Sequence, residues 1–183
     1  AVAVTAPNGG ERWEIATSQN VAWTRVGSIA NVKLEYSTNG FADELQTVVL
    51  TASTPADPLP ADNAGTYAWT IPNAASTTAK VRLSDATDAT VVDTSNANFS
   101  IVGRLTLNAP NGSEVWIVAT TQNISWTRFG SIANVALRYS TDGGLTWPVG
   151  NVITSSTPAD PLPADDIGTY SWTIPDAIGT LLR

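Results

Sequence analysis

The side chains best suited to chemistry are carboxylates and amides gathered towards the end of the first half of the chain. They are Asp85, Asp88 and Asp93, followed by Asn96 and Asn98. A calcium ion takes about six to eight oxygen ligands, and loops rich in Asp and Asn often supply them. The same residues also form turns without an ion, because their side chains bond their own backbone. Both interpretations stay open, and calcium at Asp85, Asp88 and Asp93 is the one cofactor that the sequence suggests.

A second candidate is the segment from Ser140 to Trp147, which has the order Ser-Thr-Asp-Gly-Gly-Leu-Thr-Trp. This order matches the Asp-box, a hairpin known from sialidase-like propellers. In such a hairpin Asp142 is expected to bond the backbone of its own turn, with Gly144 at a positive φ and Trp147 packed beneath. The pattern predicts a folding hairpin first and a ligand site at Trp147 second.

The tryptophans suggest a further ligand, because indole faces stack on sugar rings. Six of the seven form three pairs at one constant spacing: Trp13 with Trp116, Trp23 with Trp126, and Trp69 with Trp172. Core packing explains paired aromatic residues on alternating strands. Trp147 has no counterpart, so it is the best single candidate for contact with a cell-wall glycan.

Composition removes most enzyme classes. The chain has no His, Cys or Met, so the usual general base, the thiol nucleophile and the common zinc ligands are missing. Paired carboxylates of the glycosidase kind remain, but these acids fall in predicted surface turns. With 16 acidic and 9 basic residues, little would neutralise a phosphate backbone, which argues against nucleic acid. No apolar stretch approaches the roughly 20 residues of a membrane-spanning helix.

These candidate residues lie in a chain that contains one sequence unit twice. Residues 1–80 align with residues 104–183 at a constant shift of 103 positions, and 45 of the 80 aligned residues are identical. The period is close to the roughly 100 residues of an immunoglobulin-type sandwich. We therefore predict two domains, residues 1–103 and 104–183. The second copy is cut short, because residues 81–103 have no counterpart after Arg183.

Each copy has the pattern of an all-β sandwich. Short segments of alternating apolar and polar residues recur between clusters of turn residues, and no window has a helical period. The segment 31–37 places Val32, Leu34 and Tyr36 towards the core. The complete copy holds about seven such strands, with the usual uncertainty in their ends.

The missing part of the second copy would contain its last two strands. Their first-copy counterparts are predicted at Ala79–Ser84 and Asn98–Val102. The penultimate strand of a sandwich is central in its sheet, so its loss would uncover Val135, Leu137 and Tyr139 and leave an unpaired sheet edge. We predict that this strand-completion surface is covered either by a longer chain or by strands from a neighbouring subunit.

The turn and core motifs resemble a known group of proteins. They are Pro-Asn-Gly-Gly-Glu, Gln-Asn-Val-Ala-Trp, Leu-Glu-Tyr-Ser and Tyr-Ala-Trp-Thr-Ile-Pro. Their order resembles tandem immunoglobulin- or fibronectin-like repeats of large secreted bacterial and archaeal proteins. It is also similar to the N-terminal domain of the Ser/Thr-rich, GPI-anchored Kre9/Knh cell-wall family. The resemblance implies an extracellular module of a surface, adhesive or wall-associated protein, with no catalytic residue to carry over.

These observations predict an all-β chain of two tandem immunoglobulin/fibronectin III-like β-sandwiches, the second lacking its last two strands. We expect a non-catalytic structural module of a secreted or cell-surface protein: a stalk, an adhesin or a filament subunit. The expected partners are neighbouring repeats, further copies of the chain and cell-wall glycan. The alternative is an accessory carbohydrate-binding module of a secreted hydrolase, acting through Trp147.

Overall fold

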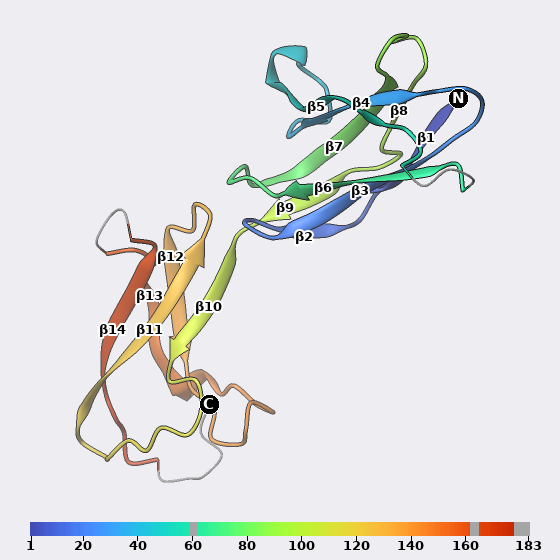
Figure 1. Cartoon of the computed structure of the whole chain (residues 1–183). Helices are drawn as coiled ribbons and strands as arrows, with labels where there is room; N and C mark the ends of the chain where they lie inside the picture. Colours follow the sequence, from blue (N-terminus) through green and yellow to red (C-terminus); the bar gives the residue numbers. More distant parts are fainter. Residues whose placement is uncertain (59–61, 162–164, 178–183) are drawn as a thin grey trace. The chain divides into compact units, whose positions relative to one another are not determined.

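The computed structural model describes residues 1–58, 62–161 and 165–177, and these are built from β-strands and two short 3₁₀ turns (Figure 1). The chain divides into two compact units, Ala1–Gly103 (unit 1) and Arg104–Arg183 (unit 2). Within the described ranges, no helix has the length and apolar character needed to cross a bilayer.

Unit 1 contains nine strands among its described residues. They are β1 (Val2–Ala6), β2 (Arg12–Glu14), β3 (Ser18–Arg25), β4 (Asn31–Ser37), β5 (Thr47–Pro55), β6 (Ala64–Thr70), β7 (Ser76–Asp85), β8 (Val92–Thr94) and β9 (Phe99–Val102). The 3₁₀ turn η1 (Glu44–Gln46) precedes β5. Pro55 lies at the end of β5, which pairs with β4 alone in the described residues, and proline is tolerated on such an edge strand.

Two sheets face each other in unit 1. One has the order β1-β3-β6, and the other has the order β2-β9-β7-β4-β5, with β8 paired to β7. Strand β7 is central in the larger sheet, since it pairs with β4 on one side and with β9 on the other. The short strand β2 joins this sheet only through a parallel pairing with β9.

The core of unit 1 lies between the sheets and follows the alternation of the strands. Val32 and Leu34 of β4 are fully buried, and so are Val81 and Leu83 of the adjacent strand β7, with Leu83 opposite Leu34. Burying a Val or Leu side chain completely contributes about 1.5–3 kcal/mol, so this strand pair is a large part of the core. Trp69 packs near Tyr36, Trp13 and Phe99 at ring-centroid separations of 4.7, 5.9 and 6.5 Å and closes one end.

Unit 2 repeats only part of this arrangement. Its described strands are β10 (Arg104–Ala109), β11 (Thr121–Phe129), β12 (Asn134–Arg138), β13 (Val152–Pro158) and β14 (Ile167–Thr173), with the 3₁₀ turn η2 (Val149–Asn151). One sheet has the order β10-β11-β14 and matches β1-β3-β6. The other consists of β12 and β13 and matches β4 and β5.

A tryptophan and a glycine fix the same contact in both units. Trp23 donates its indole N–H to the carbonyl of Ala56 at 2.9 Å, and Trp126 donates to the carbonyl of Ala159 at the same distance. The indole lies flat against a glycine of the neighbouring strand. A Cβ on Gly65 would come within 2.4 Å of Trp23, and one on Gly168 would come within 2.1 Å of Trp126. Only glycine leaves room for the ring.

Residues 104–183 match residues 1–80 of unit 1, so the two units can be compared over β1 to β6. Within that range, the segment 115–117, which corresponds to β2, is not a strand. In unit 1, β2 is held by its pairing with β9, and the described residues of unit 2 give 115–117 no such partner. Strand β8 of unit 1 was not among the strands expected from the sequence.

Candidate functional site

The open edge of β12 is the main difference between the units. In unit 1, β4 pairs with β5 on one edge and with β7 on the other. Among the described residues of unit 2, β12 pairs with β13 alone. In unit 1 the other edge is taken by β7, whose counterpart would begin at residue 179, outside the described residues.

An apolar groove lies beside this edge. It has a volume of about 230 Å³, and it is lined by Leu105, Leu107, Trp126, Val135, Ala136 and Leu137. We call it the β12 groove. In unit 1 the equivalent space is closed by β7 and β8, which contact β1. There the Asp93 carboxylate of β8 accepts a hydrogen bond from the Val4 backbone N–H at 2.7 Å.

Exposure of matched side chains measures how much of the core is uncovered. Val4 of β1 is 3% exposed, whereas its counterpart Leu107 is 46% exposed. Val2 is 8% exposed and Leu105 is 47% exposed. The face of β10 that holds these two leucines is therefore more exposed in the described structure than the matching face of β1.

The predicted strand-completion surface coincides with the β12 groove in part. Val135 and Leu137 line the groove, with Val135 buried and Leu137 half-buried. Tyr139 follows the end of β12, is half-buried, and packs against Trp172 at 5.3 Å between ring centroids. The sequence analysis missed Leu105 and Leu107, although their alternation on residues 104–109 was a usable signal.

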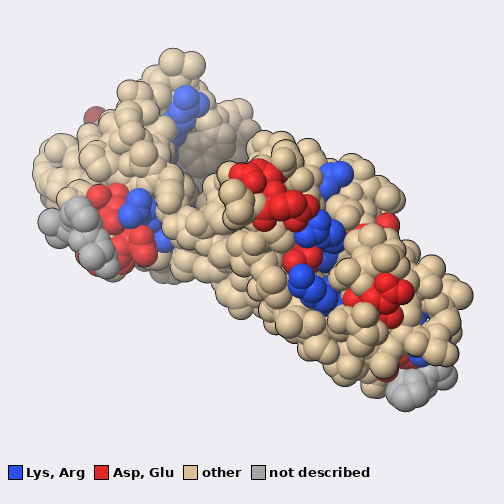
Figure 2. Space-filling model, turned by 90° about the horizontal axis from the view of Figure 1, so that it is seen from above, with Lys and Arg blue, Asp and Glu red and all other residues tan. Residues whose placement is uncertain are grey.

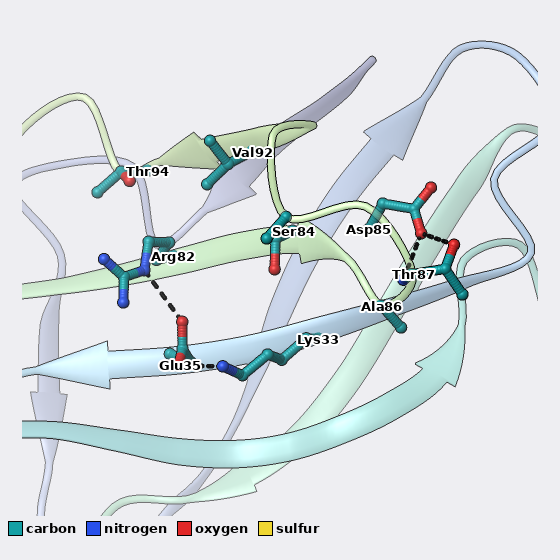
Figure 3. Close-up of a pocket in the computed structure, with 10 residues that line it drawn as sticks. Lys33, Glu35, Arg82, Ser84, Asp85, Ala86, Thr87, Val92 and Thr94 are labelled. Atoms are coloured by element: carbon teal, nitrogen blue, oxygen red, sulfur yellow. Dashed lines mark hydrogen bonds and ion pairs between the residues drawn. The ribbon is translucent and has the colours of Figure 1, made fainter.

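The outer face of the larger sheet of unit 1 carries a network of ion pairs. Glu35 of β4 contacts Lys33 at 2.6 Å and Arg82 of β7 at 3.0 Å (Figure 3). Arg82 also reaches Glu44 at 2.8 Å and lies over the Phe41 ring at 4.5 Å. The hydrogen bond from Arg82 lowers the pKa of Glu44, and Glu44 in turn raises that of Arg82.

This network borders an open hollow of about 720 Å³ that also includes Asp85 and Thr87. Lys33, Glu35 and Arg82 already neutralise one another in part, and Figure 2 shows basic and acidic side chains next to each other on the visible face of this unit. A hollow whose charges are internally paired offers little to a charged ligand. Its contacts hold β7 against β4.

The hairpin at residues 140–147 has the predicted internal bonds. Asp142 accepts hydrogen bonds from Thr146 through both the backbone N–H, at 2.9 Å, and the hydroxyl. It also accepts one from the Ser140 hydroxyl, and Gly144 has a φ of 89°. These bonds hold the pKa of the Asp142 carboxyl far below its usual range. Trp147 is 47% exposed, so it is more open than the packing predicted for it.

The three carboxylates of the calcium prediction have separate bonding roles. Asp85 accepts from the N–H and hydroxyl of Thr87, both at 2.8 Å, which lowers its pKa. Asp88 accepts from the N–H and hydroxyl of Thr90, and Asp93 accepts from Val4. Over residues 1–58, 62–161 and 165–177, no group of three or more acidic side chains is arranged to hold a metal. Calcium binding here stays a prediction.

Comparison with known proteins gives structural neighbours only. No protein-family model and no curated protein sequence matches the chain. The fibronectin(III)-like modules of Clostridium thermocellum CbhA share 18% identity, with 94% of this chain and 78% of that chain covered and a TM-score of 0.32. The ectodomain of the teleost fish polymeric immunoglobulin receptor shares 10% identity over 84% and 72%, with a TM-score of 0.41. The structure itself shows an all-β chain of two compact units over its described residues.

Proposed function

We propose that the chain is a non-catalytic structural module of a secreted or cell-surface protein, used as a stalk, adhesin or filament subunit. In this role unit 2 is completed by strands from outside the described residues. The observation that carries the proposal is the kind of contact that the two units share. Contacts that fix shape are repeated residue for residue, whereas the polar surface groups differ.

The repeated contacts belong to turns and to the core. Glu11 accepts hydrogen bonds from the backbone of Asn8 and Gly9, as Glu114 does from Asn111 and Gly112. Arg25 pairs with Asp57 at 2.6 Å, and Arg128 pairs with Asp160 at 2.7 Å. The tryptophan-to-carbonyl bonds described above complete the set. The duplication has therefore preserved the contacts that determine the fold of each unit.

The surface groups that could do chemistry are not repeated. Lys33, Glu35 and Glu44 correspond to Ala136, Arg138 and Trp147. The carboxylates whose pKa is shifted, such as Asp85 and Asp142, all titrate below their usual range. They stay ionised at neutral pH, whereas a carboxyl that donates a proton needs a raised pKa. Their bonds suit them to turn formation.

One observation favours a second candidate function. Trp147 is half exposed on a well-bonded hairpin, and unit 1 has Glu44 in its place. A rigid, exposed indole is a suitable platform for a sugar ring. The alternative is therefore an accessory carbohydrate-binding module of a secreted hydrolase.

Two measurements separate these functions. Antibodies raised against the chain should label the outer surface or extracellular filaments of the intact cells that produce it. Labelling confined to the cytoplasm would overturn the structural proposal. In parallel, the chain and the variant Trp147→Ala are applied to a glycan array. Binding that disappears in the variant would move the assignment to the carbohydrate-binding module, and the matched variant Leu145→Ala controls for general effects on the hairpin.

A further inference from the structure

Asparagine followed by glycine is a sequence pair that loses ammonia readily without an enzyme, and it occurs three times in the chain. The pairs are Asn8-Gly9, Asn39-Gly40 and Asn111-Gly112. The backbone nitrogen of the glycine can attack the side-chain amide carbon of the asparagine before it, because a glycine has no side chain to hinder the approach. The three pairs have the same sequence, so their surroundings decide which of them reacts.

Two of the three glycine nitrogens are held by a carboxylate. The Gly9 N–H donates to Glu11 at 2.8 Å, and the Gly112 N–H donates to Glu114 at 2.7 Å. Attack requires the nitrogen to give up its proton, and a negative charge beside the N–H opposes that loss. Hydrogen bonds to a charged acceptor are also among the stronger ones, so the N–H stays directed towards the carboxylate. These two pairs are therefore protected.

The nitrogen of Gly40 lacks this protection. The residue two places after Gly40 is Ala42, where the other two pairs have their glutamates. The nearest acid in the following loop, Asp43, accepts a hydrogen bond from the Leu45 N–H at 3.0 Å instead. Over residues 1–58, 62–161 and 165–177, no acceptor lies within hydrogen-bond distance of the Gly40 N–H. The Gly40 nitrogen is therefore available for attack.

The side chain of Asn39 is polarised by its neighbour in the turn. Its carbonyl oxygen accepts a hydrogen bond from the hydroxyl of Ser37 at 2.5 Å, and Ser37 is fully buried. A donor fixed on this oxygen stabilises the negative charge that develops there when a nitrogen attacks the carbon, as an oxyanion hole does. Asn39 itself is half-buried, so water reaches the pair.

We propose that Asn39 is a site of non-enzymatic deamidation, with the Gly40 nitrogen as nucleophile and the Ser37 hydroxyl as the donor that polarises the amide. The Gly40 nitrogen gives its proton to water and forms a bond to the side-chain carbon of Asn39. The bond from this carbon to the amide nitrogen breaks, and that nitrogen takes up a proton and leaves as ammonia. Water then opens the cyclic imide at either carbonyl, which yields aspartate or isoaspartate.

The two products change the same turn in different ways. Aspartate at residue 39 gives unit 1 the Ser-Thr-Asp-Gly order of residues 140–143 and adds one negative charge to a chain of formal net charge −7. Isoaspartate routes the main chain through the side chain and so lengthens the loop that leads from β4 to Glu44, which pairs with Arg82. The inference concerns a modification, and it does not depend on the proposed function.

The test incubates the full chain in mildly alkaline buffer and follows each asparagine by peptide mapping and mass spectrometry. A modified peptide gains the mass difference between a hydroxyl and an amide group, and chromatography separates aspartate from isoaspartate. We expect Asn39 to react at least about tenfold faster than Asn8 and Asn111, the factor expected for an N–H that lacks one hydrogen bond to a charged acceptor. Its rate should rise with pH, and both products should form.

Three variants connect the rates to the contacts. Glu114→Gln keeps the size of an exposed side chain but removes its charge, so Asn111 should react several-fold faster without a threat to folding. Ser37→Ala removes the donor on the Asn39 amide and should slow deamidation there several-fold. Asn39→Gln is the control, because its longer side chain forms the cyclic imide poorly, and the modified product at residue 39 should disappear.

Each other outcome overturns the inference. If Asn111 reacts first, exposure to water decides the site, because Asn111 is exposed and Asn39 is half-buried. Equal rates at Asn8 and Asn39 would show that the carboxylate on the Gly9 nitrogen gives no protection. Aspartate without isoaspartate would indicate direct hydrolysis by water instead of attack by Gly40. A faster reaction in Ser37→Ala would show that Ser37 restrains the amide and does not activate it.

Discussion

Leu34 and Leu137 occupy the same position of the repeat and have different surroundings. Leu34 is fully buried between β5 and β7, whereas Leu137 is half-buried and lines an open groove. The residues around them are largely identical, so the difference arises from residues 76–102, which close unit 1. The described repeated residues thus form two partial sheets in unit 2, whereas in unit 1 the strands β7, β8 and β9 close the core.

The largest expected effect comes from truncating these two leucines. Leu34→Ala should destabilise unit 1 by about 2–5 kcal/mol, because it removes fully buried atoms and leaves a cavity. Leu137→Ala should cost less than about 2 kcal/mol, since its side chain already meets solvent. Hydrogen exchange read separately on β4 and β12 measures both costs in the full chain. Equal costs would mean that unit 2 is closed in solution, and the comparison would fail.

The next largest effect on stability is expected from adding a methyl group beneath each of the two buried indoles. Gly65→Ala places a Cβ within 2.4 Å of Trp23, and such overpacking costs about 1–3 kcal/mol. Gly168→Ala makes an equally close contact with Trp126, but Trp126 lines the groove and has room to move. We expect a smaller cost in unit 2, measured by denaturant unfolding followed by fluorescence.

Gly150→Ala is the control for this pair, since nothing lies within 4 Å of its added Cβ and its φ is not positive. Gly150→Ala should leave the free energy of unfolding almost unchanged. If Gly168→Ala is as costly as Gly65→Ala, the open groove does not loosen the packing of Trp126. The difference between the units would then be confined to β10 and the β12 edge.

Local pattern was enough to predict most strands of unit 1 and the inward face of β4. The segment predicted at 31–37 is β4, and Val32 and Leu34 point inward as the alternation indicated. The same alternation puts Glu35 on the outer face of β4, yet its exposure is only 7%, because Lys33 and Arg82 close over it. Alternation predicts on which face of the strand a residue lies, but it does not predict which side chains cover that face.

The features that sequence reasoning missed depend on distant pairing. Strand β8 has three residues and is held by its pairing with β7, so it is too short to show a periodic pattern in the sequence. Residues 115–117 have lost the strand of their counterpart because β9 has no equivalent beside them. Leu105 and Leu107 have the same alternation as Val2 and Val4, and only the missing neighbours make them exposed. The exposure of a side chain therefore depends on whether a neighbouring strand covers it, as well as on the sequence of its own segment.

A smaller, pH-dependent effect should separate the two hairpins. Asp142 in unit 2 corresponds to Asn39 in unit 1, and only the former titrates. The pKa of Asp142 is lowered by hydrogen bonds from Ser140 and Thr146, so its contribution is present above the unfolded value, near 3.9, and is lost as pH falls further. Asp142→Asn should therefore lower the Tm of unit 2 at pH 7 and lower it by a smaller amount at pH 2.

The reciprocal variant Asn39→Asp sharpens this test, because Ser37 already donates its hydroxyl to Asn39. Residue 146 is Thr, whereas unit 1 has Asp43 in its place, so no threonine hydroxyl stands at this position for the new carboxylate. It should not stabilise unit 1 at pH 7. If it does so as strongly as Asp142 stabilises unit 2, the Thr146 contacts are not what distinguishes the hairpins.

The smallest effect on stability is expected at Trp147. Its side chain is 47% exposed, and the bonds of its hairpin are made by Ser140, Asp142 and Thr146. Surface substitutions outside such bonds usually stay within about 0.5 kcal/mol, so Trp147→Ala should leave the thermal unfolding of unit 2 almost unchanged. A loss well above this value would show that the indole packs beneath the turn after all. A near-neutral effect would instead show that the fold does not require this large aromatic side chain. In unit 1, Glu44 stands at this position and pairs with Arg82 of β7, so there the side chain does stabilise the fold. A role for Trp147 would then have to be detected by binding experiments, because stability measurements would not reveal it.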